Sequence, residues 1–515
     1  MSPPLLRVQG LSKRFGETQA LLDVSLEIVP GEVHVIAGEN AAGKTTLVSI
    51  LGGVYRPDAG RILLDGRPVE IRSPADAVAA GIGLVHQHPE LVAPFTALEN
   101  IVLGREGPSR LWLDVARQRA DVEAQARRYG LDVPLEAPVG TLSVGQQQKV
   151  EILKTLYRGV RVLILDEPTS LLSPQEADAL LGTVRLLTRG GLTAIVITHK
   201  IREARSVGDR VTVLRNGRVV GTVSLAETSD AALVEMMFGQ IETAMPVRTP
   251  VTSAPALVIQ DLSLVTEHGA VILDHCTLDV RAGEIVGLAG VAGNGQAELA
   301  EAIIGARRIA AGRITLFGRD LTHAAVADRL AAGLAYVPGD RRREGILPSL
   351  SLADTLILGL EPVWVREHRT YDPARIRDLA TGVIAEYRIA ARDGAVPTAT
   401  LSGGNLQKLL LARAVLQATA ADRSVLVAVN PTNGLDVATT LFVHGRLVDL
   451  QQRGRGLLLI SEDLDELTSL CDRILVMRRG RIVGEITRGA YDLYAIGALM
   501  TGAGPAAVQT ASGPR

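Results

Sequence analysis

The sequence predicts an α/β fold made of two tandem domains of the same kind. Two observations lead to this prediction. A glycine-rich block at residues 38–45 follows a strand-like apolar stretch and recurs, with changes, at residues 290–297. Continuous aliphatic runs, at residues 160–166 and 194–199, suit parallel strands that are covered on both faces. A repeat period near half of the chain indicates duplicated domains rather than a solenoid of short units.

The composition fits folded globular domains. The chain has 515 residues, of which 47% are hydrophobic and 21% charged, and a net charge of −2. A nucleic-acid partner held by a basic surface is therefore not expected. No apolar run approaches the ~20 residues that cross a bilayer, and the N-terminus lacks a signal-peptide pattern. Cys276 and Cys471 lie far apart without a C-x-x-C pattern, so we interpret both as buried apolar side chains in a reducing compartment.

The expected domain order follows from local composition. Residues 1–240 form the first domain, with strands at 5–8 and 22–28 and a helix at 116–129, where Ala, Arg, Gln and Glu abound. Residues 241–255, rich in Pro, Thr and Ser, are expected to be a linker. Residues 256–502 form the second domain. The Gly-, Ala-, Ser- and Pro-rich residues 503–515 are expected to be a mobile tail.

The first glycine-rich block fits G-x-x-x-x-G-K-[ST], the phosphate-cradling loop of nucleotide hydrolases. Its backbone N–H groups and the following helix N-terminus favour phosphate oxygens. Lys44 would reach the β- and γ-phosphates, and the Thr45 hydroxyl would bind Mg²⁺. The residues expected to surround the nucleotide here are Gly38, Glu39, Asn40, Ala41, Ala42, Gly43, Lys44, Thr45 and Thr46.

The second copy keeps the glycines but changes the residues that carry chemistry. Gln296 stands at the lysine position and Ala297 at the hydroxyl position. Other blocks are also repeated: residues 30–33 match 282–285, residues 142–149 match 401–408, and residues 208–218 match 471–481. The second domain is thus a copy whose phosphate loop is altered.

These blocks together resemble ATP-binding cassette (ABC) ATPases, specifically the fused two-cassette subunits of bacterial importers for monosaccharides and nucleosides. The resemblance covers about residues 5–500, and its motifs occur twice in the same order. It implies two phosphate-loop cassettes, each with a mostly parallel core sheet, an antiparallel β subdomain and an inserted helical lobe. It also implies a head-to-tail pair, in which each ATP lies between one cassette's phosphate loop and the other cassette's signature loop.

For the first site, the resemblance implies a complete set of residues. Asp166 would hold Mg²⁺ and Glu167 would be the general base for the attacking water. Gln87 would sense the γ-phosphate and magnesium, His199 would contact the γ-phosphate, and Phe15 would stack on adenine. The opposite wall would come from the second cassette, through Ser402, Gly403, Gly404 and Asp436.

For the second site, the resemblance implies a degenerate centre. The changed positions are Thr266 for the aromatic, Gln296, Ala297, Gly339 for the glutamine, Val429 for the acid, Asn430 for the base and Glu462 for the histidine. The opposing loop of the first cassette carries Val144 in place of a glycine, and Ser173 stands at the aspartate position. We expect one catalytic and one degenerate site.

Two features stay open at this point. His86 and His88 flank Gln87 and could form a metal pair, but no further ligands accompany them. Arg341, Arg342 and Arg343 are either a solvated charge run or, by the resemblance, part of a loop near the subunit contact.

The resemblance implies an ATPase that uses ATP and Mg²⁺ at the cytoplasmic face of the membrane. Its partners would be separate transmembrane permease subunits and, indirectly, an extracytoplasmic solute-binding protein, with no nucleic acid. Residues 85–92, 142–154 and 461–466 look closest to the nucleoside branch. A monosaccharide importer is the near alternative. Twin-cassette ATPases acting on ribosomes or DNA are disfavoured, because they usually keep both sites competent.

Overall fold

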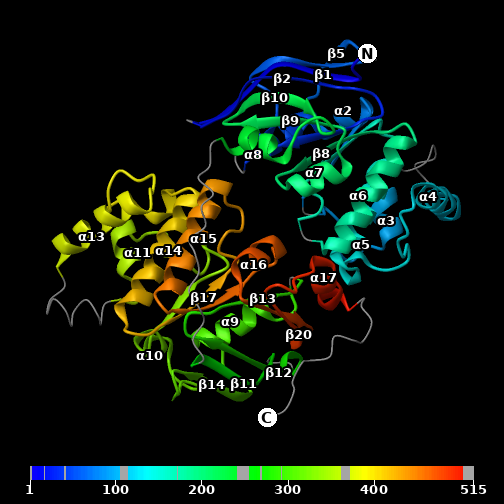
Figure 1. Cartoon of the computed structure of the whole chain (residues 1–515). Helices are drawn as coiled ribbons and strands as arrows, with labels where there is room; N and C mark the ends of the chain where they lie inside the picture. The colour runs from blue at the N-terminus through cyan, green and yellow to red at the C-terminus, as the bar shows by residue number, and fades with distance from the viewer. Residues whose placement is uncertain are drawn as a thin grey trace. The chain divides into compact units, whose positions relative to one another are not determined.

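The computed structural model divides into two compact units, Met1–Glu242 and Thr243–Arg515, each described here by itself (Figure 1). The structure describes every residue except 1–2, 17, 40–41, 88, 105–113, 171, 240–253, 267–268, 292, 361–371 and 503–515, and the backbone alone of residues 437–438. The expected linker lies outside the described residues except at its end, where the first strand of the second unit begins at Pro255.

The first unit contains two sheets. The antiparallel sheet has the strand order β2-β1-β4-β5 and the core sheet has the order β10-β9-β3-β8-β7-β6. The strands are β1 (Leu6–Phe15), β2 (Thr18–Ile28), β3 (Val33–Ala37), β4 (Ala59–Leu64), β5 (Arg67–Val69), β6 (Ile82–Val85), β7 (Val162–Asp166), β8 (Thr193–Thr198), β9 (Arg210–Arg215) and β10 (Arg218–Ser224).

The second unit repeats this plan. Its antiparallel sheet has the order β12-β11-β14-β15 and its core sheet the order β16-β17-β18-β13-β19-β20. The strands are β11 (Pro255–Val265), β12 (Val271–Arg281), β13 (Ile285–Ala289), β14 (Ala311–Leu316), β15 (Arg319–Asp320), β16 (Leu334–Val337), β17 (Val425–Val429), β18 (Gly456–Ile460), β19 (Arg473–Arg478) and β20 (Arg481–Thr487).

Helices cover both core sheets. In the first unit they are α1 (Lys44–Leu51), α2 (Pro74–Ala79), α3 (Ala97–Val102), α4 (Val115–Tyr129), α5 (Val144–Tyr157), α6 (Pro174–Arg189), α7 (Ile201–Val207) and α8 (Asp230–Phe238). In the second unit they are α9 (Gln296–Ile304), α10 (Val326–Ala331), α11 (Leu352–Ile357), α13 (Pro373–Glu386), α14 (Gly403–Ala420), α15 (Val437–Gln452), α16 (Leu464–Leu470) and α17 (Leu493–Thr501).

The core strands are buried on both faces, which explains their unbroken aliphatic runs. In β17, Val425, Val427 and Val429 face the cluster that contains α9 and the antiparallel sheet. Leu426 and Ala428 face the cluster of α11, α13, α14 and α15. Figure 1 shows these helices gathered on one side of the second core sheet, with β11, β12 and β14 on the other. This arrangement confirms the expected α/β fold class.

Individual elements differ from the sequence expectations at their ends. The expected strand at residues 5–8 is β1, which runs to Phe15 because it pairs with β2 along its length. The expected helix at 116–129 is α4, which begins one residue earlier, at Val115, after the capping side chain of Asp114. Cys276 and Cys471 are both buried free thiols, as interpreted from the sequence. Among the described residues, no helix is long and apolar enough to cross a membrane.

An ion pair inside the second unit should contribute strongly to its stability. Arg473 Nε lies 2.7 Å from Glu284 Oε1, and both side chains are almost completely buried. Leucine at position 473 leaves the Glu284 carboxylate buried without its cation, which typically costs about 3–5 kcal/mol. We therefore expect Arg473→Leu to lower the hydrogen-exchange protection of β13 and β19 in the full chain.

The matched control is Arg481→Leu. Arg481 pairs with Asp274 at the surface, with 64% of its side chain exposed, so its loss should cost less than about 1 kcal/mol. Equal losses of protection in the two variants would contradict this assignment.

Candidate nucleotide-binding site

The first phosphate loop connects β3 to α1 at the carboxyl edge of the core sheet. Gly43 caps α1 with φ of 99°, and a Cβ at this position would lie 2.5 Å from the Ala20 carbonyl oxygen. A side chain would therefore meet both strain and a clash. Gly38 begins the loop, and Asn40 and Ala41 lie outside the described residues.

Lys44 points back into this loop. Its side chain is buried, and Nζ donates to the carbonyl oxygens of Gly38, at 2.8 Å, and Glu39, at 2.9 Å. Burial lowers the pKa of Lys44, while the charges of Glu167 and Asp166 oppose that effect. The ammonium is thus held inside the loop by two backbone carbonyl groups.

The residues beside Lys44 differ in exposure. Ala42 is buried, Thr45 is exposed and Thr46 is half-buried. The Thr45 hydroxyl hydrogen-bonds the carboxylate of Asp166, the last residue of β7. Burial and then the charge of Glu167 raise the pKa of Asp166. An exposed hydroxyl beside a buried carboxylate is an oxygen donor set that fits Mg²⁺.

Three side chains expected to catalyse hydrolysis meet at Glu167. His199 Nδ1 lies 3.1 Å from Glu167 Oε1, and Gln87 Nε2 donates to Glu167 Oε2 at 3.4 Å. Burial alone would raise the pKa of Glu167, but the hydrogen bond and charge of His199, together with Lys44, hold this pKa below its ordinary value. The carboxylate is thus kept in its basic form.

Glu167 also has an unusual backbone. Its φ is 45°, in the left-handed region that costs a non-glycine residue about 1–3 kcal/mol. The Glu167 N–H donates to the Ile197 carbonyl oxygen at 3.2 Å, next to the end of β8. This backbone turns the side chain toward His199, which follows β8 directly.

The expected adenine platform is an exposed ring in an aromatic pair. Phe15 is 41% exposed, and its ring centroid lies 5.1 Å from that of Tyr55 in an edge-to-face arrangement. Lys13 Nζ lies 5.5 Å from the Phe15 centroid. Neither Tyr55 nor Lys13 was expected beside Phe15, because the contact of Tyr55 with a residue 40 positions earlier leaves no local pattern in the sequence.

The four residues expected from the second cassette lie close together within the second unit. Ser402 caps α14, and Gly403 and Gly404 form its first residues. Asp436 caps α15, where its carboxylate accepts from Thr439 N at 2.8 Å and Thr439 Oγ1 at 2.7 Å. A Cβ on Gly404 would lie 4.0 Å from Asp436 Oδ2. The start of α14 therefore lies beside the start of α15.

In the second phosphate loop, side chains of the loop form hydrogen bonds with the loop's own backbone. Gln296 Nε2 donates to the Val291 carbonyl oxygen at 3.0 Å, and Gln296 Oε1 accepts from Asn294 N at 3.1 Å. Asn294 Nδ2 donates to the same Val291 oxygen at 2.8 Å. One backbone N–H of the loop is thus occupied by a neutral side chain, and no cation replaces Lys44.

The acid and base positions of the second unit keep the backbone geometry of the first. Asn430 has φ of 43° and donates its N–H to Ile460 O at 2.7 Å, while its Oδ1 accepts from Glu462 N at 3.2 Å. Val429 is an apolar residue in the acid position, and a Cβ on Gly339 would lie 3.0 Å from Val429 Cγ1. The fold is retained at this position, but the carboxylates are absent.

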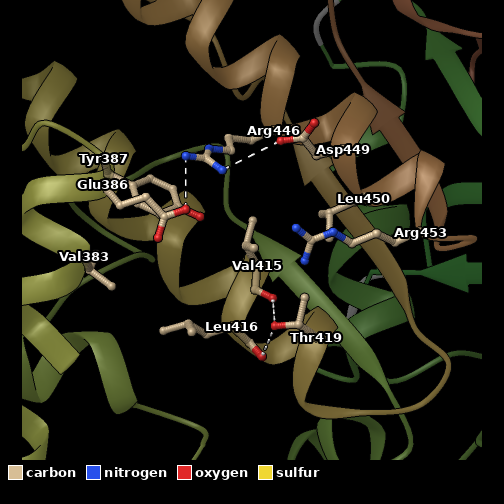
Figure 2. A pocket seen from close by; sticks show the side chains of 10 residues that line it. All are labelled: Val383, Glu386, Tyr387, Val415, Leu416, Thr419, Arg446, Asp449, Leu450 and Arg453. Atoms are coloured by element: carbon tan, nitrogen blue, oxygen red, sulfur yellow. Dashed lines mark hydrogen bonds and ion pairs between the residues drawn. The ribbon is translucent and has the colours of Figure 1, made fainter. Parts of the chain in front are cut away.

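A hollow of about 190 Å³ lies elsewhere in the second unit, between α13, α14 and α15 (Figure 2). Figure 2 shows Arg446 directed at Glu386 and Asp449, to which it is joined by ion pairs of 3.1 and 3.7 Å. The same guanidinium lies 5.0 Å from the Tyr387 ring centroid. Because Arg446 has two carboxylate partners, it is a packing element of the helical layer.

The histidine pair beside Gln87 gains no support as a metal site. His86 Nε2 lies 4.0 Å from Glu90 Oε1, and His88 lies outside the described residues. Within the described ranges, no group of three or more His, Cys, Asp or Glu side chains could hold a metal.

Comparisons with known proteins place the chain among ATP-binding transport proteins. A family model described as "ABC transporter" matches residues 21–170 and 273–428, one segment in each unit. A glucose import ATP-binding protein of Haloferax volcanii is 41% identical over 98% of this chain and 96% of its own length. A nucleoside import ATP-binding protein of Lactococcus lactis is 37% identical over 97% of this chain and 98% of its own. A ribose import ATP-binding protein of Streptomyces avermitilis is 40% identical over 97% of both.

The contact between His199 and Glu167 predicts a pH effect on nucleotide hydrolysis. Removing the imidazole in His199→Ala leaves burial as the dominant influence, so the pKa of Glu167 should rise. The base form then needs a higher pH, and the acid limb of the kcat profile should move upward. Steady-state hydrolysis across a pH series measures this shift.

The control for this experiment is His275→Ala. His275 is an exposed histidine of the second unit that pairs with Asp261. Its substitution should leave the acid limb in place. An unchanged acid limb in His199→Ala would show that the imidazole does not set the pKa of Glu167.

Proposed function

The chain belongs to the ABC transporter family, as a twin-cassette ATPase subunit of importers, and on that premise we propose that it powers nucleoside import with one competent and one degenerate ATP site. One observation carries the proposal. Glu167 and Asn430 share the same left-handed backbone at the end of matching strands, but only Glu167 brings a carboxylate. The two units thus offer the same scaffold with different chemistry.

In the competent site, each residue has a distinct role. Glu167 polarises the attacking water as general base, and its contact with His199 keeps the carboxylate ionised. Lys44 and His199 bind the γ-phosphate, and Phe15 stacks on adenine. Thr45, Gln87 and Asp166 would hold Mg²⁺, which would supply neutralising charge for the β- and γ-phosphates.

In this proposal, the second cassette would complete the same site. Ser402, Gly403 and Gly404 present a hydroxyl and backbone N–H groups at the start of α14, which favours phosphate oxygens. Asp436 joins them from the start of α15. ATP binding would close the two cassettes, and hydrolysis at Glu167 would reopen them.

The degenerate site should turn over very slowly. It has Asn430 in place of the base, Val429 in place of the metal acid and Gln296 in place of the lysine. Losing a positioned general base alone typically costs ~10²–10⁴ in rate. We propose that the degenerate site supports the closing of the two cassettes and does not catalyse hydrolysis.

The transported solute is proposed from similarity, because the ATPase subunit itself does not touch it. Residues 85–92, 142–154 and 461–466 look closest to the nucleoside branch, and one relative is a nucleoside import protein. Relatives from glucose and ribose import support the alternative, a monosaccharide importer. In either case the partners would be membrane permease subunits and a solute-binding protein, with this chain at the cytoplasmic face.

The first test of the proposal compares two matched substitutions. Glu167→Gln removes the base and should lower the ATPase rate of the full chain by ~10²–10⁴. Asn430→Gln adds one methylene at the corresponding backbone position and should leave most of the rate. A Glu167→Gln variant that retained substantial ATPase activity would contradict the one-catalytic-site assignment.

The second test addresses the solute. Lys44→Ala removes the buried ammonium of the first phosphate loop, so cells that carry it should lose uptake of labelled nucleosides and keep uptake of labelled pentoses and hexoses. Gln296→Ala, the matched change in the second loop, should have the smaller effect. Selective loss of sugar uptake would retain the mechanism and overturn the nucleoside assignment.

A further inference from the structure

In both units, the loop that follows an edge strand of the core sheet, β6 or β16, is hydrogen-bonded to the helix that begins at the signature loop, α5 or α14. In the second unit, the buried Arg413 of α14 donates to the Gly345 carbonyl oxygen at 3.0 Å. In the first unit, Lys154 of α5 donates to the Glu90 carbonyl oxygen at 2.9 Å. A cation at the same place in each helix thus holds this loop against the helical lobe.

The second unit adds a contact through Arg341, which lies in the same loop. Arg341 Nη2 donates to the Asn433 carbonyl oxygen at 2.9 Å, and Nη1 donates to the Gly403 carbonyl oxygen at 3.4 Å. One guanidinium therefore joins the start of α14 to the loop that leads into Asp436. A Cβ on Gly434 would lie 3.1 Å from Arg341 Nη2, so the glycine leaves room for the guanidinium.

The turn around Arg341 is itself fixed. Asp340 Oδ1 accepts from the backbone N–H groups of Arg342, at 3.1 Å, and Arg343, at 3.0 Å. Burial lowers the pKa of Arg341, but a guanidinium keeps its charge at neutral pH. The exposed Arg342 and Arg343 neighbour a half-buried arginine with two carbonyl partners.

The first unit carries a residue without a side-chain donor at the position that corresponds to Arg341. Arg341 lies four residues after the end of β16, and the residue four after the end of β6 is Pro89, which carries no side-chain donor. There the loop contributes Gln87 to Glu167 instead. The two loops therefore make different contacts. The loop after β6 contacts the Glu167 carboxylate, and the loop after β16 contacts the first turn of α14.

We propose that Arg341 is a positioning residue for ATP hydrolysis, which holds Ser402–Gly404 and Asp436 together as one rigid wall of the competent site. This inference rests on the proposed function, in which that wall covers the ATP bound by Lys44. Arg341 fixes the relative placement of two helix starts whose groups must meet the γ-phosphate together, and a displacement of about 1 Å at such groups can cost on the order of 10²-fold in rate.

The test uses the full chain with Arg341→Ala, Arg341→Lys and the control Arg342→Ala. We expect Arg341→Ala to lower kcat by about tenfold or more, with little change in KM. The reason is that the wall would act in the hydrolysis step, whereas the initial binding of ATP would depend on the phosphate loop of the first unit. Lysine provides a single point of charge, so Arg341→Lys should recover only part of the rate. Arg342→Ala, which removes an exposed charge from the same turn, should match the unsubstituted chain.

The outcomes separate the possible causes. Equal kcat values for Arg341→Ala and Arg342→Ala would overturn the inference. A fall in kcat matched by loss of folded protein in thermal unfolding, for both the alanine and the lysine variant, would also overturn it and leave a structural role only. If Glu167→Gln kept its ATPase activity, the proposed function would fail; if Glu167→Gln were inactive and Arg341→Ala normal, only this inference would fail.

Discussion

The parallel register of the core strands is the constraint on which the first site depends. β3, β7 and β8 run side by side in the same direction, so the phosphate loop, Asp166 and His199 all emerge at one edge of the sheet. Lys44 can then lie within reach of two carboxylates that are far away in sequence. The buried aliphatic side chains of these strands fix the strands in place. The polar residues that follow the strand ends are therefore held at the same edge of the sheet.

The second unit shows what this constraint fixes and what it leaves free. Its strands keep the same order, and its base position keeps the same left-handed φ. The groups beyond the strand ends have changed: Gln296 bonds to its own loop, and Val429 packs near Gly339. Backbone geometry and catalytic chemistry are thus separable, because the first depends on the hydrophobic core and the second on a few side chains at the edge.

Much of the fold and of the first site could be predicted from the sequence, because short motifs tied to strand ends encode both. The phosphate loop, Asp166, Glu167 and His199 each lie at the end of an aliphatic run, and the family resemblance implied that they share one site. Tyr55 and the bridge from Arg341 to Asn433 could not be predicted in this way. They depend on how loops far apart in sequence approach each other, and neither contact leaves a local pattern.

The shared left-handed backbone carries a different amount of strain at this one position in the two units. Asparagine is one of the few residues that tolerate this region, whereas a longer acidic side chain bears more of the strain. The first unit holds Glu167 there, and the second unit holds Asn430. The end of β17 therefore stores less conformational energy than the matching end of β7.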